Sequence, residues 1–164
     1  MADPIRIANC SGFFGDRLSA AREMVDGGPI DVLTGDWLAE LTMYIFSKTK
    51  ERRPDGGFAR TFVAQMVDVL GDCLDQGIKV VANAGALDPH GCAAAVEQVA
   101  ADQGLSPKIA VVTGDDLIGR IGELQAAGHD LAHLDTGEPL GDMAAEMLTA
   151  NAYLGGWGIA EALA

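Results

Sequence analysis

The sequence has no long apolar run and no leader-like start. Hydrophobic residues make up 49% of its 164 positions, yet no stretch reaches the roughly 20 apolar residues that a membrane-spanning helix needs. Residues 1–4 lack the basic region and apolar core of a signal peptide. These absences predict a soluble, cytoplasmic protein with no membrane partner. The length suffices for one domain with its own core.

Positive charge is scarce. Lys and Arg number 11 against 24 Asp and Glu, so the net charge is -13 at pH 7. A protein with this balance repels phosphates, and the composition therefore argues against nucleic acid as a partner. The negative charge is spread along the chain, which we interpret as a solvated surface. An anionic ligand would need backbone N–H groups or an Arg to hold it.

Cysteines are few and unpaired in pattern. Cys10, Cys73 and Cys92 form no CxxC motif and no Cys/His cluster, which argues against a disulfide framework and a structural zinc site. We expect Cys73 and Cys92 to be small core residues. Cys10 lies in a turn before a helix, where a thiolate nucleophile is favoured. No His stands close to it in sequence, so this role is the weaker interpretation.

Three familiar catalytic or nucleotide-binding motifs are also missing. The segment 11–15 lacks the first glycine of the GxGxxG dinucleotide fingerprint. No GxxxxGK[ST] phosphate loop and no GxSxG nucleophile elbow occur anywhere in the chain. The sequence therefore excludes these nucleotide sites and the hydrolase elbow.

What the chain does have is a repeated strand–turn–helix pattern. Four β-branched apolar runs each end in a small polar turn with Gly, at residues 5–8, 30–33, 78–82 and 109–112. Runs with almost no polar residue are typical of strands covered on both faces. The pattern predicts one α/β domain over residues 1–164. Its sheet would be open, mainly parallel and of at least four strands, with helices on both faces in Rossmann-like layering.

Helical spacing and capping residues delimit the remaining elements. Asp36 is placed to N-cap a helix, Gly77 to end one, and Pro89 to stand in the first turn of another. The segment 51–57 is the clearest loop. The predicted helices cover residues 17–25, 37–49, 58–76, 89–103, 115–128, 142–150 and 159–164.

Polar residues gather where the four runs end. Because the carboxyl ends of parallel strands share one edge, we expect the turns 9–17, 34–36, 83–85 and 113–116 to form one crevice. The expected proton-transfer residues are Asp16, Asp36 and Asp115. The expected substrate-binding residues, with glycines that allow close approach, are Asn9, Ser11, Gly12, Arg17, Thr34, Gly35, Asn83, Gly85 and Gly114. Taken singly, each of these residues also fits ordinary cap or turn chemistry.

Longer stretches carry a family resemblance. Residues 7–21, 27–42, 57–62, 83–89 and 114–117 resemble the acyclic terpene utilisation family, the AtuA-like proteins. The resemblance runs over essentially the whole chain. It implies a place in bacterial pathways that degrade citronellol and geraniol through acyl-CoA intermediates, as a hydratase or lyase acting on a branched acyl-CoA.

The same resemblance bears on whether this chain is a whole family protein or a part of one. Typical family proteins are longer, and residues 152–163 look like an internal family segment. Residues 158–164 also start an amphipathic helix without a cap or polar tail. We therefore expect the N-terminal portion of a longer protein, or one piece of an assembly. In that case a homo-oligomer or a partner chain would supply the rest of the fold.

Three hypotheses for function follow. In the first, an enzyme domain binds an acyl-CoA or related carboxylate through turn amides, and one carboxylate moves a proton in hydration, dehydration or C–C cleavage. In the second, the chain is a non-catalytic subunit or interaction domain. In the third, a metal-dependent hydrolase or lyase binds Mg²⁺ through the Asp cluster, since nearby carboxylates are suitable ligands. The sequence does not decide which cofactor, if any, is used.

Overall fold

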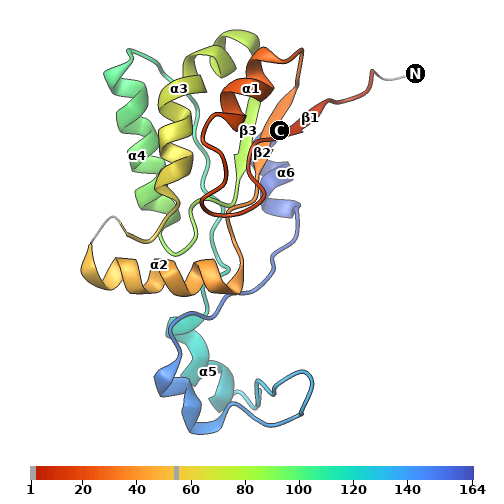
Figure 1. Ribbon diagram of the computed structural model, residues 1–164. Helices are drawn as coiled ribbons and strands as arrows, with labels where there is room; N and C mark the ends of the chain where they lie inside the picture. Colours follow the sequence, from red (N-terminus) through yellow and green to blue (C-terminus); the bar gives the residue numbers. More distant parts are fainter. Residues whose placement is uncertain (1–2, 54–55) are drawn as a thin grey trace.

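A parallel sheet organises the chain in the computed structural model, which describes residues 3–53 and 56–164 (Figure 1). Within these residues the sheet has three strands, in the order β1 (Ile7–Asn9), β2 (Val32–Gly35) and β3 (Lys79–Ala82). Both strand pairs are parallel. The α/β class and the parallel direction are thus confirmed. Residues 1–2, and Pro54 and Asp55 of the predicted loop, lie outside the described residues.

The helices follow the strands in the alternating order that the sequence predicts. They are α1 (Ala20–Asp26), α2 (Glu40–Arg52), α3 (Arg60–Gln76), α4 (Pro89–Asp102), α5 (Ile121–Ala126) and α6 (Trp157–Leu163), with short 3-10 segments η1 (Ile118–Arg120) and η2 (Gly141–Glu146). In Figure 1, α2 starts near the carboxyl ends of the strands and runs beneath α3 and α4, and the segment from η1 to η2, which includes α5, forms a small lobe below it. None of the described helices is long and apolar enough to cross a bilayer.

The main core lies between one face of the sheet and α1, α3 and α4. Leu33 is fully buried there, and its register partners Ala8 and Val80 pack against the same core. Neighbouring strand positions point to the opposite face. On that face Ile7 remains 66% exposed. Figure 1 shows α6 behind the strands, while α1 and α3 lie in front.

The run 109–112 differs from the prediction because it is not assigned to a strand. Its backbone makes no recorded hydrogen bond to β3, so the described ladder ends at β3. Ile109 and Val112 are 36% and 39% exposed. Apolar β-branched composition favours an extended backbone, but composition does not supply a hydrogen-bonding neighbour.

Of the predicted helix ends, those at Gly77 and Pro89 are confirmed and the one at Asp36 is wrong. Gly77 ends α3 with a left-handed backbone (φ 70°), and Asp88 accepts the Gly91 N–H at the start of α4, with Pro89 in the first turn. The expectation that Asp36 caps a helix from residue 37 is wrong, because α2 begins at Glu40. Asp36 instead accepts the Leu38 N–H in a local turn. The delay lets Trp37 turn inward, where it is 2% exposed.

Two helices expected near the C-terminal end are shorter than their patterns suggest. The segment 115–128 becomes helical only from Ile118 onward, through η1 and α5. The segment 142–150 contains the 3-10 segment η2, not an α-helix. Few residues of this lobe are buried, Ile121 among them. Helix patterns need an apolar face to pack on, and the lobe offers little of one.

Candidate functional site

The first two turns are joined by backbone hydrogen bonds at the carboxyl edge of the sheet. Cys10 N–H donates to the Thr34 carbonyl oxygen at 2.8 Å, and Asp36 N–H donates to the Ser11 carbonyl oxygen at 2.8 Å. These bonds extend the β1–β2 pairing past the strands. The turns 9–17 and 34–36 therefore lie side by side at this edge of the sheet.

Asp36 and Asn83 connect the second turn to the third. Asn83 Nδ2 donates to Asp36 Oδ1 at 2.6 Å, and Asn83 Oδ1 accepts the Trp37 N–H at 2.9 Å. Asp36 Oδ1 also accepts the Leu38 N–H at 3.0 Å. Both donors use Oδ1, and no described residue is recorded as donating to Oδ2. The carboxylate is thus held by one oxygen while the exposed group keeps the second for other partners.

The first loop uses its polar side chains to hold its own shape. Asp16 accepts N–H bonds from Gly12 at 2.9 Å and Arg17 at 2.7 Å. These two backbone donors hold the pKa of Asp16 below its usual value. Arg17 forms an ion pair with Glu23 at 2.8 Å. The Asp16 carboxylate therefore stays ionised and stabilises its own loop. A carboxylate held in this way is a poor proton donor near neutral pH.

Asn9 and Ser11 are engaged in the same loop. Asn9 Oδ1 accepts the Ser11 N–H at 3.0 Å, and Ser11 Oγ donates to the Phe13 carbonyl oxygen at 3.0 Å. Ser11 is buried, whereas Asn9 is exposed. These contacts give both residues a structural role at the positions that the sequence marks as substrate-binding.

Two of the candidate glycines are required by neighbouring protein atoms. A Cβ at Gly35 would lie 2.5 Å from the Trp37 ring, and a Cβ at Gly85 would lie 2.8 Å from Pro89. At Gly12 the nearest atom would be 3.8 Å away, on Asp16. Gly114 has φ +112°, a backbone conformation that favours glycine. The sequence predicts that a ligand approaches the backbone closely at these glycines. At Gly35 and Gly85 the atoms that do so belong to Trp37 and Pro89 of the chain itself.

The fourth turn pairs with a different segment. Asp115 Oδ2 accepts from Asn151 Nδ2 at 2.9 Å, and the Asp115 carbonyl oxygen accepts the Ala152 N–H at 2.8 Å. Asp116 forms an isolated antiparallel bridge with Asn151. No hydrogen bond recorded among the described residues joins Asp115 to Asp16 or Asp36. Recorded hydrogen bonds thus join the first three turns to one another, while the fourth turn is bonded to residues 150–152.

A cavity of about 310 Å³ separates α2 from the chain that enters and leaves the lower lobe. This volume is at the small end of the range for ligand pockets. Lys50 Nζ crosses from α2 to the third turn and donates to the Leu87 carbonyl oxygen at 2.8 Å. The cavity is lined by Ser47, Lys50, Glu51, Leu87, Asp116, Ile118, Leu148 and Thr149.

Sequence reasoning missed the part that α2 contributes. The candidate residues all came from the turns, yet four of the 11 Lys and Arg residues fall within residues 48–53. That local reversal of charge in an acidic chain was the signal available. It marks the end of α2 that reaches the cavity.

Cys10 is buried, and its surroundings do not suit a nucleophile. It is 3% exposed, and its Sγ lies 3.9 Å from Gln65 Oε1. Burial raises the pKa of its thiol to about 11, so the thiol is protonated at neutral pH. Cys73 and Cys92 are buried in the same core, as predicted. Within residues 3–53 and 56–164, no group of three or more His, Cys, Asp or Glu converges as a metal-ligand set.

Comparison with known protein families identifies a match to this chain. A family model described as acyclic terpene utilisation family protein AtuA matches residues 5–164. No curated protein and no solved structure matches the chain significantly. The matched range contains all the turns and the cavity described above.

Proposed function

Because the chain belongs to the acyclic terpene utilisation family of AtuA proteins, we propose that it is an enzyme domain that acts in the breakdown of acyclic terpenes. Its substrate would be a branched acyl thioester such as an acyl-CoA, and its reaction a hydration or a related lyase step. The site would lie at the carboxyl edge of the sheet. Asp36 would be the residue that moves the proton.

The observation that carries this proposal is the one-sided anchoring of Asp36. Asn83 and the Leu38 N–H hold Oδ1, which leaves Oδ2 of the exposed carboxylate for a substrate or water. Asp16 has both oxygens engaged within its own loop. Asp115 is bonded to Asn151, at the fourth turn, which is joined to residues 150–152. Among the three predicted carboxylates, the geometry therefore favours Asp36.

A hydration can be written with these groups alone. Asp36 Oδ2 would take a proton from water as the water oxygen bonds to the β-carbon of an α,β-unsaturated thioester. The carboxylic acid so formed would return that proton to the α-carbon. Asn83 would keep the carboxylate oriented throughout, since an oriented base contributes about 10²–10⁴-fold to such a step.

Asp36→Asn tests the proposal, and Asp16→Asn is its matched control. We expect Asp36→Asn to lower turnover of a branched enoyl-CoA by about 100-fold or more, and Asp16→Asn to change it far less. Turnover is followed by loss of the ultraviolet absorbance of the conjugated thioester, with folding checked by circular dichroism. Unchanged turnover in a folded Asp36→Asn protein would remove the proton-transfer role.

A second candidate function is that of an interaction domain. It is favoured by large apolar side chains at the surface, among them Trp157 at 87% and Ile7 at 66% exposed. Exposed apolar groups of this size are common where proteins associate. Enoyl-CoA turnover separates the candidates, because a non-catalytic interaction domain would show none whatever its oligomeric state.

A further inference from the structure

One long polar side chain lies inside the apolar core. Gln65, on α3, is 3% exposed, and Phe62 and Met66 beside it on the helix belong to the core. Burying an amide in apolar surroundings costs free energy unless the amide is hydrogen-bonded. An apolar side chain of similar size would fill the same space without that cost. The contacts of the Gln65 amide therefore explain why a polar residue is kept there.

The Gln65 amide reaches both ends of the loop between β1 and α1. Its Nε2 donates to the Cys10 carbonyl oxygen, where the loop begins, and to the Leu18 carbonyl oxygen, near its end, at 3.4 Å in each case. An amide nitrogen carries two hydrogens, so one group can serve both carbonyls. On the other side, Oε1 accepts from the Cys10 thiol at 3.9 Å. Both halves of the amide are thus matched to groups of the loop.

The buried thiol suits this contact. Burial raises the pKa of Cys10 to about 11, so its sulfur keeps the proton at neutral pH and can donate it to an oxygen. A thiolate would offer Gln65 Oε1 no hydrogen. The geometry therefore gives Cys10 a part in holding the loop, in place of a nucleophilic role.

The same loop is bonded to the backbone of the candidate site. The Ser11 carbonyl oxygen accepts the Asp36 N–H at 2.8 Å, and Cys10 N–H donates to the Thr34 carbonyl oxygen at 2.8 Å. Hydrogen bonds within the loop, described above, fix its interior. A loop with a fixed interior moves as one body, so its place beside Asp36 depends on where it is anchored. Gln65 supplies an anchor on α3.

We propose that Gln65 is a positioning residue for the candidate site. Its amide holds both ends of the loop 10–18 against α3, and the loop in turn holds the backbone of Asp36. The inference deepens the proposed function, and its catalytic part rests on that function, because Asp36 is the residue that would move the proton. Gln65 acts through the loop and not on the substrate.

Amide hydrogen exchange in Gln65→Met tests the holding role without any substrate. Met fills a similar volume but donates no hydrogen bond, so the carbonyls of Cys10 and Leu18 regain a partner from water only when the loop moves outward. We expect the Cys10 and Asp36 amides to exchange about tenfold faster or more, relative to amides within α3 and α4 that report global unfolding. Gln65→Leu repeats the test with a differently shaped apolar side chain. Unchanged relative rates in the folded variants would overturn the proposal.

Gln103→Met is the matched control. Gln103 follows α4, and its Nε2 donates to the Val67 carbonyl oxygen of α3 at 2.7 Å, so it also joins α3 to a neighbouring segment through one amide. Among the described residues, no bond is recorded from Gln103 to the loop 10–18. We expect this variant to leave exchange at Cys10 and Asp36 as in the wild-type chain. Equal acceleration by both variants would overturn the proposal, because general loosening of α3 would then be the cause.

Turnover of a branched enoyl-CoA tests the catalytic part. A displaced base slows the chemical step more than it weakens substrate binding, so we expect Gln65→Met to lower kcat about tenfold or more and to change KM less than about twofold. Gln103→Met should change neither. Faster exchange at Asp36 with an unchanged kcat would overturn the catalytic part. If Asp36→Asn itself leaves turnover unchanged, the proposed function fails, and the exchange rates still decide whether Gln65 holds the loop.

Discussion

At the residue scale, small side chains at the carboxyl edge are explained by what lies against them. Gly35 leaves room for the ring of Trp37, which also packs edge-on to Phe62 with ring centroids 5.2 Å apart. Asn83 holds the Trp37 N–H from the neighbouring turn. Gly35 is therefore needed for the packing of Trp37 in the core.

Gly35→Ala should destabilise the protein by about 2 kcal/mol, because its Cβ would lie 2.5 Å from the Trp37 ring. Urea unfolding followed by circular dichroism measures the change. Gly122→Ala is the control, since nothing lies within 4 Å of that Cβ and the residue stands inside α5. We expect Gly122→Ala to leave the free energy of unfolding unchanged or to raise it slightly, since Ala favours a helix more than Gly does. Similar losses in both variants would contradict the packing explanation.

The buried thiols make stability depend on alkaline pH. Burial raises the pKa of Cys10 and of Cys92 from 9.0 to about 11. As pH rises from 9 toward 11, the unfolded chain loses these protons while the folded chain keeps them, so stability falls across this window. The slope approaches about 1.4 kcal/mol per pH unit for each thiol.

Urea unfolding across that window measures the loss, and Cys92→Ala should make the slope shallower, because one of the three thiols whose pKa is raised by burial is removed. A slope that is unchanged in Cys92→Ala would show that other groups cause it. Native Cys10 should also react far more slowly with iodoacetamide than it does in urea, because the thiolate is the reactive form.

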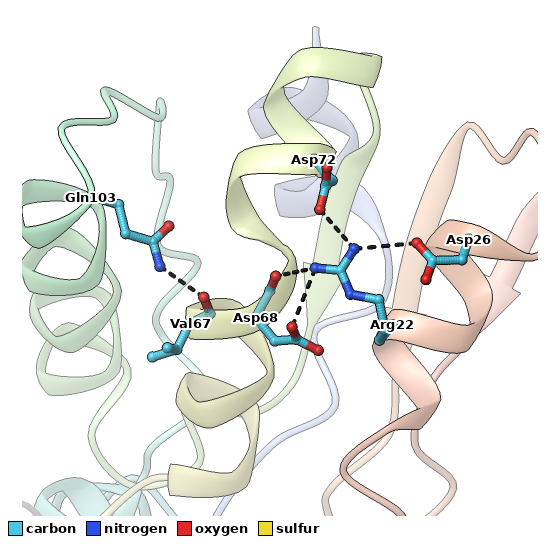
Figure 2. A network of polar contacts seen from close by, with 6 residues as sticks. All are labelled: Arg22, Asp26, Val67, Asp68, Asp72 and Gln103. Atoms are coloured by element: carbon cyan, nitrogen blue, oxygen red, sulfur yellow. Dashed lines mark hydrogen bonds and ion pairs between the residues drawn. The ribbon is translucent and has the colours of Figure 1, made fainter.

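At the element scale, α1 is fastened to α3 by one arginine. Arg22 on α1 donates through Nη1 to Asp72 Oδ2 at 2.7 Å and to Asp26 Oδ1 at 3.2 Å. Through Nη2 it donates to the Asp68 carbonyl oxygen and carboxylate (Figure 2). These carboxylates raise the pKa of Arg22 above its usual value. In the same view Gln103, next to α4, donates to the Val67 carbonyl oxygen of α3 at 2.7 Å.

Arg22→Met should therefore cost about 1–2 kcal/mol of unfolding free energy, since several charge-assisted bonds between two helices are lost at a partly exposed position. Arg120→Met is the control, because Arg120 pairs only with nearby Glu123 among its recorded contacts and is more exposed. We expect less than about 0.5 kcal/mol there. Chemical denaturation at low and high salt tests both variants, and equal effects would refute the fastening role.

At the scale of the whole molecule, the two faces of the sheet differ. One face packs on α1, α3 and α4, while the other exposes Ile5 and Ile7 at 72% and 66%. The register places Ile7 beside Val32 and Lys79 on that second face. An apolar surface of this kind is where a homo-oligomer, or a partner chain, would form its contact.

We predict that the chain self-associates through this face and that Ile7→Lys shifts it toward monomer. A charge on an apolar contact costs desolvation energy on association. Light scattering over a concentration series gives the mass. Leu134→Lys is the control, because Leu134 is 98% exposed but belongs to the lower lobe. A monomer at all concentrations, or equal effects of both variants, would count against this contact surface.

The sequence alone determined the local steps of the fold. Nearly continuous apolar runs predicted β1, β2 and β3 to within two residues. Gly77 and Pro89 marked helix ends, because backbone chemistry acts within a few residues. The family resemblance was also legible, and the match over residues 5–164 confirms it. The acidic balance, the core cysteines and the missing motifs needed no structure.

Only the tertiary structure decided how those elements meet. The run 109–112 has strand composition but no described ladder, since pairing depends on a neighbour that no local pattern specifies. Asp16 and Asp36 look alike in sequence, yet one braces its own loop and the other is held by Asn83 from a distant turn. The cavity wall joins Lys50, Leu87 and Asp116 from three separated segments. Long-range contacts of this kind are set by packing, because chain distance does not determine which side chains share a cavity.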